Sequence, residues 1–403
     1  MPFDHLDYPQ TSTRPLSVLY LLAEFPVLSE TFVSNEIRAM RSLGHRAVPV
    51  AITPHAGRNQ PDDADLRAET LLLGGEPARS AMLDAFARPA GLERALRFIR
   101  TQTGLPRRSL LLAGARVAAV ARRLGCTHIH AHFAQGAAAT AIVGARIAGA
   151  TVSFTGHGFD VYGSPCDLPQ KLAAADLAVA VCSDMLADFR AMAPTARLAM
   201  VPCGVDPSRF RPLGTAPRNG RLLAIGRLAP QKGYGVLLDA IASLPPDQRP
   251  ELDVVGDGAL RPMLEARIGA QGLASWVRLL GSRDSAWIAA EGPAYLGLVA
   301  PFVVTPDGDR DTGPVVVKEA MAMGLPVVAS ALMGLKETVD DASGRLVPPG
   351  DPDALAGALR WVAGLPEAQR RILGSAGRAR VEAGFTLRLQ AQRLAGAIRS
   401  LRR

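Results

Sequence analysis

The chain has 403 residues, of which 48% are hydrophobic and 20% are charged. A chain this apolar can bury a large core, which excludes intrinsic disorder, and it is too aperiodic for a coiled coil or collagen. At about 150 residues per domain, the length predicts two domains. The four cysteines lack Cys-x-x-Cys spacing, so reduced thiols are expected rather than a zinc ribbon.

The net charge of +8 is concentrated in one segment. Residues 88–123 hold nine arginines and one acidic residue, Glu93, an excess equal to that of the whole chain. Nucleic-acid binding is disfavoured, because Phe98 is the only aromatic residue interleaved in the segment to stack on bases. Apolar residues recur there partly at helical spacing, which is typical of a basic helix on an anionic membrane. A solvated helix face explains the pattern equally well.

The ends and apolar runs of the sequence bear on localisation. Acidic residues stand near the N-terminus where a signal peptide needs basic ones. No apolar run reaches the roughly 18 residues of a membrane span. We expect a cytoplasmic protein, with peripheral attachment to the inner face of the cell membrane left open.

In the first half, short apolar runs alternate with helical patterns, which is typical of βαβ units and a parallel sheet. Strands are predicted at 16–22, 47–52, 129–133, 151–155, 177–182 and 198–202. Helices are predicted at 30–43, within 90–124 (one or two basic helices), at 136–148 and at 184–192. Residues 1–14 and 55–80 are expected to be irregular.

The second half repeats the alternation. Strands are predicted at 221–225, 252–255, 277–280, 295–300, 326–329 and 344–347. Helices are predicted at 233–243, 314–323, 352–362 and about 386–401. The Pro- and Gly-rich stretch 202–217 marks a boundary. We therefore expect an α/β protein whose two doubly wound domains, 1–207 and 208–385, face each other across a cleft. Ligands of such sheets bind beyond the carboxyl ends of the strands.

The segment Gly226-Arg227-Leu228-Ala229-Pro230-Gln231-Lys232-Gly233 follows a predicted strand and enters a helix. Two cations beside a helix N-terminus suit a diphosphate, because the helix dipole and the side chains both favour anions. The alternative is an exposed loop with solvated charges. The segment is not a Walker loop, because the Gly-x4-Gly-Lys-Ser/Thr order is absent.

Residues 307–319 contain the start of the next candidate helix. Asp311 or Thr312 can cap the helix that Pro314 begins. Glu319 lies within the first two turns, where a buried carboxylate can accept hydrogen bonds from the vicinal hydroxyls of a ribose. The alternative is an exposed glutamate paired with Arg or Lys.

Two loops of the first half are also candidates. In Gly156-His157-Gly158-Phe159-Asp160, the glycines allow close approach of a ligand. His157 can donate to a sugar hydroxyl or a phosphate, although a lone histidine is more often structural. In the loop 24–31, Ser29 is a candidate N-cap at another helix start that favours anions.

A metal site and a dinucleotide site are disfavoured. His128, His130 and His132 alternate on a strand and could ligate zinc if they faced one way. No acidic or cysteine partner has fitting spacing, and strand alternation explains the pattern, so we expect no metal. Gly256-Asp257-Gly258 does not complete Gly-x-Gly-x-x-Gly, which disfavours an NAD oxidoreductase.

Taken in order, several segments resemble one family. They are Phe25–Phe32 with Glu36-Ile37, Ile129–Phe133, Thr155–Asp160, Val201–Asp206 with Phe210, Gly226–Leu228 with Lys232-Gly233, Val255–Gly258, Asp307–Asp311 and Glu319–Ala329. The set resembles the retaining GT-B glycosyltransferases of the glycogen-synthase-like and sucrose-synthase-like group. The resemblance is greatest to bacterial transferases of exopolysaccharide assembly, of the colanic-acid type.

The resemblance implies a transferase with two Rossmann-like domains, in which the C-terminal one holds a nucleotide-sugar donor, UDP-sugar favoured and GDP-sugar as alternative. Arg227 and Lys232 would grip the diphosphate, Glu319 would bind the ribose, and His157 would contact the donor sugar. Asp311 stands for the first Glu of the family's Glu-x7-Glu motif. Further implied substrate contacts are Ser29, Glu30, Thr31, Gly156, Asp160, Gly226, Gly313, Pro314 and Val315.

The resemblance also implies no bound metal or cofactor, a saccharide or lipid-linked acceptor, and a terminal segment, 386–403, that crosses back to the N-terminal domain. Two departures bear on specificity. Asp311 is one methylene shorter than the usual Glu, and Thr312-Gly313-Pro314 shifts the usual glycine by one position. Three alternatives therefore stay open: a transferase acting on a small secondary metabolite, a GT-B-fold sugar-nucleotide epimerase, and a non-catalytic nucleotide-sugar-binding protein.

Overall fold

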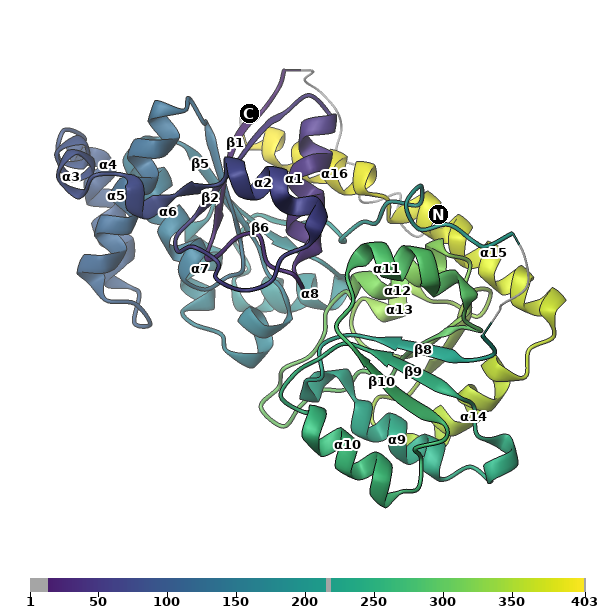
Figure 1. Ribbon diagram of the computed structural model, residues 1–403. Helices are drawn as coiled ribbons and strands as arrows, with labels where there is room; N and C mark the ends of the chain where they lie inside the picture. Colours follow the sequence, from purple (N-terminus) through teal and green to yellow (C-terminus); the bar gives the residue numbers. More distant parts are fainter. Residues whose placement is uncertain (1–13, 215–218, 402–403) are drawn as a thin grey trace. The chain divides into compact units, whose positions relative to one another are not determined.

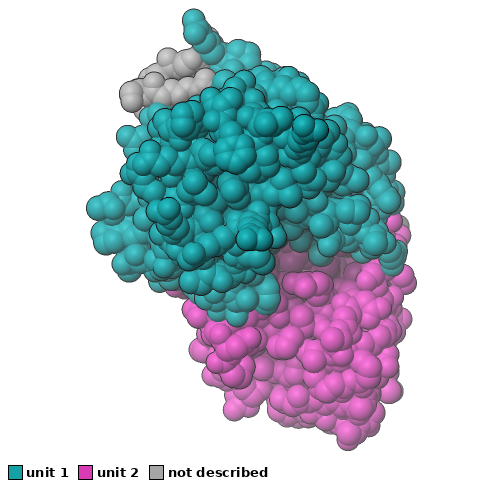
Figure 2. All heavy atoms as spheres, turned by 90° about the vertical axis from the view of Figure 1, so that its left-hand side faces the viewer, with its two compact units in different colours: residues 1–202, 387–403 teal, residues 203–386 magenta. Residues whose placement is uncertain are grey.

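The computed structural model describes residues 14–214 and 219–401 and divides the chain into two compact units. Unit 1 runs to Pro202 and resumes at Leu387, and unit 2 comprises Cys203–Thr386 (Figure 2). The chain enters unit 2 within the Pro- and Gly-rich stretch that the sequence marks as a boundary. Of the segment 1–14, all but Arg14 lies outside the described residues.

Unit 1 is built on a seven-stranded parallel sheet with the order β3-β2-β1-β4-β5-β6-β7 (Figure 1). The strands are β1 Ser17–Leu22, β2 Arg46–Ala51, β3 Leu71–Leu72, β4 His128–His132, β5 Thr151–Thr155, β6 Leu177–Ala180 and β7 Leu198–Met200. Strand order reverses between β1 and β4, the kind of switch point beyond which doubly wound sheets bind ligands. Buried parallel strands read as apolar runs, which is why the strands of this unit were predictable except for the two-residue β3.

The helices of unit 1 cover both faces of this sheet. They are α1 Thr31–Ser42, α2 Ala64–Glu69, α3 Ala78–Phe86, α4 Pro89–Arg100, α5 Arg107–Arg123, α6 Gly136–Ala148, α7 Leu168–Ala174, α8 Ser183–Met192 and α16 Leu387–Ser400. The terminal helix α16 lies beside α1 (Figure 1). Both helices bury apolar side chains in one core with Val18 and Tyr20 of β1. Helix α6 packs on β4 and β5, and α4 and α5 pack on α6.

The expectation that residues 55–80 are irregular is wrong. They contain α2, β3, two short 3₁₀ turns and the start of α3. Leu66 is the one buried residue within α2, and Ala81 and Ala85 are those of α3. With so few buried positions, apolar residues do not recur at helical spacing in this polar segment, and the sequence gives no helix signal.

Unit 2 repeats the architecture with a six-stranded parallel sheet in the order β10-β9-β8-β11-β12-β13. The strands are β8 Leu222–Ile225, β9 Leu252–Val255, β10 Val277–Gly281, β11 Leu298–Ala300, β12 Val327–Ser330 and β13 Gly344–Val347. The helices are α9 Tyr234–Ala242, α10 Arg261–Ala270, α11 Ser285–Glu291, α12 Val315–Ala322, α13 Leu335–Thr338, α14 Pro352–Ala363 and α15 Glu367–Gly384. The doubly wound α/β fold predicted for each half is confirmed.

Helix α15 is an element that the sequence analysis missed. It packs on α12, and the backbone of Gly324 lies so close that a Cβ on Gly374 would be 2.0 Å from its carbonyl oxygen. The buried residues of α15 are three glycines, Arg370 and Val381. With one apolar side chain among them, hydrophobic periodicity does not reveal the helix. Among the described residues, no helix is both long and apolar enough to cross a membrane.

Candidate active site

The loop after β8 places Lys232 at the carboxyl end of the unit 2 sheet. Lys232 ends a 3₁₀ turn that begins at Pro230, and Gly233 follows with φ +67°. A Cβ on Gly233 would lie 1.8 Å from the carbonyl oxygen of Pro301, so only glycine fits this approach to the loop after β11. The glycine therefore holds Lys232 against the neighbouring loop.

Lys232 and Asp311 form the central contact of this site. The Nζ atom of Lys232 lies 2.5 Å from Oδ2 of Asp311, and 4.2 Å from the centre of the Phe302 ring. The other carboxylate oxygen of Asp311 accepts a hydrogen bond from the backbone N–H of Gly313 at 3.3 Å. The expectation that Asp311 or Thr312 caps the following helix is wrong: the cap residue of α12 is Pro314, with no side-chain cap.

Arg227 lies in the same loop as Lys232 and is exposed. Within the described part of the chain, its guanidinium has no hydrogen-bond or ion-pair partner. Its charge acts on Asp309, whose carboxyl is buried; burial raises the pKa of Asp309, and Arg227 opposes this. The Oδ1 atom of Asp309 has no partner among the described residues. Sequence reasoning missed Asp309, because nothing in its spacing separates it from the neighbouring surface acids.

Glu319 lies on α12, 8% exposed. Burial raises the pKa of its carboxyl to about 7, and Arg209 opposes the shift. No hydrogen bond to this carboxyl is present among the described residues. Of the two interpretations, a buried carboxyl or an exposed one paired with a cation, the structure supports the buried one. The loops after β8 and β11 at the same end of the sheet contain Gly226, Gly313 and Pro314, and Val315 begins α12. The carbonyl oxygen of Gly226 accepts a hydrogen bond from the Tyr234 hydroxyl at 3.1 Å.

The loop after β5 in unit 1 is fixed by Gly156 and Asp160. A Cβ on Gly156 would lie 2.7 Å from the Phe189 ring, so the backbone approach requires glycine. The Asp160 carboxylate accepts hydrogen bonds from the backbone N–H groups of Ala134 at 2.6 Å and His157 at 3.0 Å. Asp160 is fully buried, and burial raises its pKa to about 6. These hydrogen bonds show that Asp160 shapes the loop, and its implied substrate contact stays a prediction.

His157 is held between aromatic rings. Its ring centre lies 4.6 Å from that of Phe32 and 4.7 Å from that of Phe133. Its Nε2 atom lies 3.1 Å from Nδ1 of His132. Burial lowers the pKa of His157 well below its ordinary value, so the imidazole is neutral at physiological pH.

The three histidines of β4 share one face but do not converge on one point. His128 contacts the hydroxyls of Thr151 and Ser153, each at 2.7 Å. His130 and His132 instead meet Glu36 of α1, with one ligand-type atom from each of the three residues within 4.8 Å of the others. Sequence reasoning found no acidic partner, because Glu36 is 96 residues from His132 in the chain.

The Glu36 cluster could hold a metal by its donor types, but its atoms already have partners. His130 contacts the Ser153 hydroxyl at 2.7 Å through Nδ1 and the Thr155 hydroxyl at 3.2 Å through Nε2. Glu36 accepts from the Tyr20 hydroxyl at 3.0 Å. A satisfied hydrogen-bond network explains this buried polar cluster, and the expectation of no bound metal stays a prediction.

The segment Ser29–Thr31 lies at the carboxyl end of the unit 1 sheet. Glu30, not Ser29, is the cap residue of α1, and it makes no side-chain cap, so the predicted Ser29 cap is wrong. Next to it is a pocket of about 400 Å³. Its walls include Glu24, Glu30, Gln135, Phe133 and Phe159. The Phe159 side chain is 53% exposed. Apolar walls with a few convergent polar groups are typical of small-ligand pockets.

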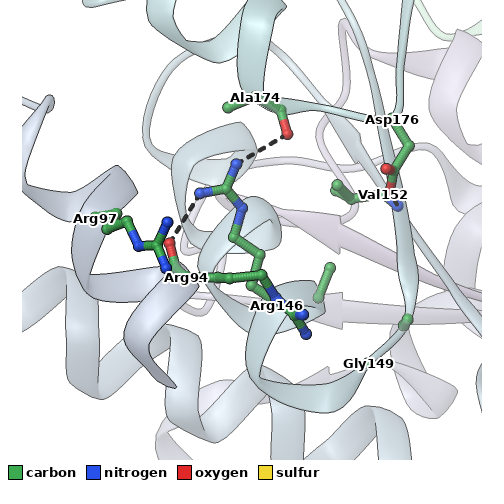
Figure 3. Close-up of a pocket in the computed structure, with 9 residues that line it drawn as sticks. Arg94, Arg97, Arg146, Gly149, Val152, Ala174 and Asp176 are labelled. Carbon is green, nitrogen blue, oxygen red and sulfur yellow. Dashed lines mark hydrogen bonds between the residues drawn. The ribbon is translucent and has the colours of Figure 1, made fainter. Parts of the chain in front are cut away.

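A second pocket in unit 1, of about 480 Å³, lies near the start of β5 and therefore at the opposite edge of the sheet (Figure 3). Arg94 and Arg97 of α4 and Arg146 of α6 line it together with Asp176. The Arg146 guanidinium donates to the carbonyl oxygens of Arg94 at 2.9 Å and Ala174 at 3.3 Å (Figure 3). This pocket is thus separate from the loops that carry the candidate active-site residues.

Two family models match the chain: "Glycosyltransferase Family 4" over residues 29–209 and "Glycosyl transferases group 1" over residues 219–364. The amylovoran biosynthesis glycosyltransferase of Erwinia amylovora is 28% identical over 94% of this chain and 98% of its own length. Among solved structures, sucrose-phosphate synthase of Thermosynechococcus elongatus is similar with a TM-score of 0.70, at 22% identity over 96% of this chain and 99% of that one. The Anabaena HepE protein in complex with UDP has a TM-score of 0.72, at 19% identity over 96% of this chain and 100% of that one.

Proposed function

The chain belongs to the group 1 glycosyltransferases with the GT-B fold, and from this premise we propose that it transfers a sugar from a nucleoside-diphosphate sugar to a hydroxyl group of a saccharide or lipid-linked acceptor in bacterial exopolysaccharide biosynthesis. The observation that carries the proposal is the arrangement in unit 2. There, the cations of Arg227 and Lys232 and the unpaired buried carboxyl of Glu319 lie on loops and a helix at one end of the sheet. The similarity to an amylovoran biosynthesis enzyme over nearly the whole chain supports the pathway class.

The proposed donor is a UDP-sugar, with a GDP-sugar as the alternative. Arg227 and Lys232 bind the diphosphate oxygens through charge-assisted hydrogen bonds, which suit such a dianion. Glu319 accepts hydrogen bonds from the ribose hydroxyls, which compensate its buried carboxylate. The UDP complex of a protein with the same fold is consistent with this donor class.

The proposed chemistry retains the configuration of the donor sugar. As the bond from the anomeric carbon to the diphosphate breaks, negative charge grows on the leaving oxygen, where Arg227 and Lys232 stabilise it. The acceptor hydroxyl attacks the same face of the oxocarbenium-like carbon, and its proton passes to the leaving phosphate oxygen. In this proposal the two cations supply the charge that a metal ion supplies in other transferases.

The proposed acceptor site is the pocket beside Ser29–Thr31. Its polar side chains are the carboxylates of Glu24 and Glu30, the amide of Gln135 and the hydroxyl of Thr53, and its lining contains no lysine or arginine. Such a lining suits a neutral saccharide better than a phosphate. The carboxylate oxygens of the pocket can accept hydrogen bonds from saccharide hydroxyls, whereas a phosphate would find no cation there.

A ligand screen tests the proposed function. Thermal unfolding is measured with UDP, GDP, ADP and dTDP and with their sugars, and products are then identified by mass spectrometry with saccharide acceptors. We expect one nucleotide series to raise the unfolding temperature and Glu319→Ala to abolish the shift. No shift with any nucleotide contradicts the proposal. Conversion of the donor without an acceptor supports the epimerase instead, and binding without turnover supports a non-catalytic role.

We further propose peripheral attachment to anionic membrane through the basic segment 88–123. Helices α4 and α5 confirm its predicted helical structure. Four of its arginines, Arg88, Arg97, Arg122 and Arg123, pair with carboxylates. In the described part of the chain, Arg100, Arg107 and Arg108 have no such partner. Leu83 and Phe86 on the adjacent α3 are 61% and 62% exposed, which adds apolar surface beside this charge.

Co-sedimentation with vesicles tests the attachment. We expect binding to vesicles containing phosphatidylglycerol but not to pure phosphatidylcholine, with a decrease at high salt. The triple variant Arg100→Gln, Arg107→Gln, Arg108→Gln should lose binding, whereas the exposed Arg371→Gln, in unit 2, should not. Equal binding of the triple variant and the unchanged protein contradicts the proposal.

A further inference from the structure

We propose that the arginine-lined pocket at the opposite edge of the unit 1 sheet binds a phosphomonoester, a phosphate dianion attached to an organic group. Arg94 and Arg97 of α4 and Arg146 of α6 supply its hydrogen bonds. All residues that line this pocket belong to unit 1, and none belongs to the loops of the candidate active site. The pocket is thus a second binding site, independent of the proposed transfer reaction.

The close packing of α4 on α6 brings the three arginines together. A Cβ on Gly91 of α4 would lie 2.7 Å from the carbonyl oxygen of Arg146, so a glycine is required for this approach. Arg94 and Arg97 follow Gly91 by about one and two helical turns and share one face of α4. Both therefore line the pocket that Arg146 lines from α6.

The Arg146 guanidinium is held in a fixed position. It donates to the carbonyl oxygens of Arg94 at 2.9 Å and Ala174 at 3.3 Å (Figure 3). Its Cζ atom lies 5.1 Å from the centre of the Phe98 ring. A guanidinium has five N–H donors, so three remain after these two bonds, without a partner among the described residues. A fixed cation with unused donors binds a ligand at a low cost in side-chain entropy.

The other two arginines can turn towards a ligand. The Arg94 side chain has no hydrogen-bond or ion-pair partner in the described part of the chain, and the residue is exposed. Arg97 pairs with Glu93 at 2.8 Å, but the two side chains are 66% and 67% exposed. Such exposed ion pairs contribute little to stability. An anion in the pocket can therefore compete with Glu93 for Arg97.

The charges around the pocket favour an anion. The lining holds three arginines and one carboxylate, that of Asp176, which gives it a net charge of +2. The Oδ2 atom of Asp176 accepts a hydrogen bond from the backbone N–H of Val152 at 2.8 Å. Burial lowers the pKa of Arg146, Asp176 opposes this shift, and the like charges of Arg94 and Arg97 lower the pKa further. A bound anion would relieve this repulsion between cations.

The lining suits a phosphomonoester better than other anions. The planar guanidinium matches the geometry of phosphate, and three arginines can serve the three free oxygens of a monoester. The dianion balances the net charge of the lining, whereas a phosphodiester carries a single negative charge. The cavity of about 480 Å³ also has room for the organic group attached to the phosphate. That group belongs either to a soluble metabolite or to a lipid such as phosphatidic acid.

Titration calorimetry of the unchanged chain with glycerol 3-phosphate at pH 7.5 tests the site. We expect saturable binding that Arg94→Gln and Arg97→Gln each weaken by about tenfold or more, because each removes a charge-assisted hydrogen bond. Arg190→Gln removes an exposed arginine of α8 outside the pocket and is the matched control. It should bind as the unchanged protein does, and so should Lys232→Ala, which alters the candidate diphosphate site of unit 2.

Three results would overturn the proposal. They are absence of binding, equal binding by the pocket variants and the unchanged protein, and loss of binding in Lys232→Ala but not in the pocket variants. Thermal unfolding without ligand checks that each variant folds. If Arg94→Gln does not fold, Arg94→Lys replaces it, because lysine keeps the charge but lacks the planar fork and should also bind more weakly.

Co-sedimentation with vesicles distinguishes the two sources of the phosphate. Vesicles containing phosphatidic acid are compared with vesicles containing phosphatidylglycerol, a diester, at equal surface charge. Stronger binding to phosphatidic acid that Arg94→Gln abolishes assigns the pocket to a lipid headgroup. Equal binding to both, together with binding of glycerol 3-phosphate, assigns it to a soluble phosphomonoester. The triple variant at Arg100, Arg107 and Arg108 should still bind glycerol 3-phosphate, so failure of the proposed membrane attachment is distinguishable from failure of this site.

Discussion

The ammonium group of Lys232 lies 2.5 Å from Oδ2 of Asp311, although 79 positions separate the two residues in the chain. The Phe302 ring packs on the same ammonium at 4.2 Å. Both charged side chains are largely buried, 13% and 20% exposed. The pair therefore holds the Lys232 side chain in place before a diphosphate binds. Binding then costs less side-chain entropy than it would with a mobile lysine.

Removing either candidate phosphate-binding cation should slow turnover of the donor. Each charge-assisted hydrogen bond contributes about 1.5–3 kcal/mol, and about 1.36 kcal/mol corresponds to a factor of ten in rate. Arg227→Ala and Lys232→Ala should thus each lower kcat/KM by roughly one to two orders of magnitude. Lys336→Ala, which removes an exposed lysine from the same unit, is the control and should change little. Rates near those of the unchanged protein in both variants would rule out this role.

The side chain at position 311 should affect activity through Lys232. Asp311→Ala leaves a largely buried ammonium without its carboxylate, so we expect a loss of about 1–3 kcal/mol in the free energy of unfolding, together with lower turnover. Asp311→Glu keeps the charge and should retain activity within about threefold by the same reasoning. Urea denaturation and donor turnover check both effects. Equal stability of the Ala variant would show that the contact contributes nothing measurable.

The buried carboxyl of Glu319 should make the free energy of unfolding depend on pH. Burial raises the pKa of its carboxyl from an ordinary 4.5 to about 7. Between these values the folded protein retains a proton that the unfolded chain has lost, so this group's contribution to the free energy of unfolding falls as pH rises from about 4.5 to 7. Glu319→Gln should flatten the stability profile in that window. Denaturation curves at a series of pH values measure it, and an identical slope in the variant contradicts the assignment.

Nucleotide binding should release a proton from the same group. Ribose hydroxyls that donate to Glu319 favour its ionised form and lower its pKa. At pH 6.5, titration calorimetry of UDP in two buffers of different ionisation enthalpy should therefore show proton release, which disappears in Glu319→Gln. Binding with the same proton release in both proteins would place the ribose elsewhere.

The terminal helix α16 should stabilise unit 1. Leu394 is fully buried in the core between α1 and β1. Leu394→Ala should therefore lower the free energy of unfolding by about 2–5 kcal/mol. Leu83→Ala makes the same change at a side chain that is 61% exposed and should cost far less. Similar losses in both variants would mean that α16 is not packed as described.

The position of a strand or helix could be predicted from the sequence where the element buries apolar side chains. Strands such as β6 and β12 are buried on both faces and read as largely apolar runs, so their positions were predicted to within a residue or two. Helix α15 was missed, because its buried residues are mostly glycines and an arginine, with Val381 as the one buried apolar side chain. Ser29 was wrongly assigned as a cap, since residue type alone does not show where a helix begins.

The residues of the candidate site also differ in how far the sequence could predict them. Local patterns identified Lys232, Glu319 and His157, each in a loop or helix that follows a strand. The partners of these residues were not predictable, because they come from distant parts of the chain. Glu36 meets His132 across 96 positions and Gln390 across 354. Such contacts depend on strand order and on the return of α16, which no short sequence pattern specifies.

We propose above all that this chain uses unit 2 to bind a nucleotide-sugar and transfer its sugar. The most direct measurement is the release of nucleoside diphosphate from a panel of nucleotide-sugars, with and without lipid-linked saccharide acceptors, by the unchanged protein and by Lys232→Ala and Glu319→Ala. We expect acceptor-dependent release from one donor class, reduced at least tenfold in both variants. Release that is absent with every donor, or equal in all three proteins, would contradict it.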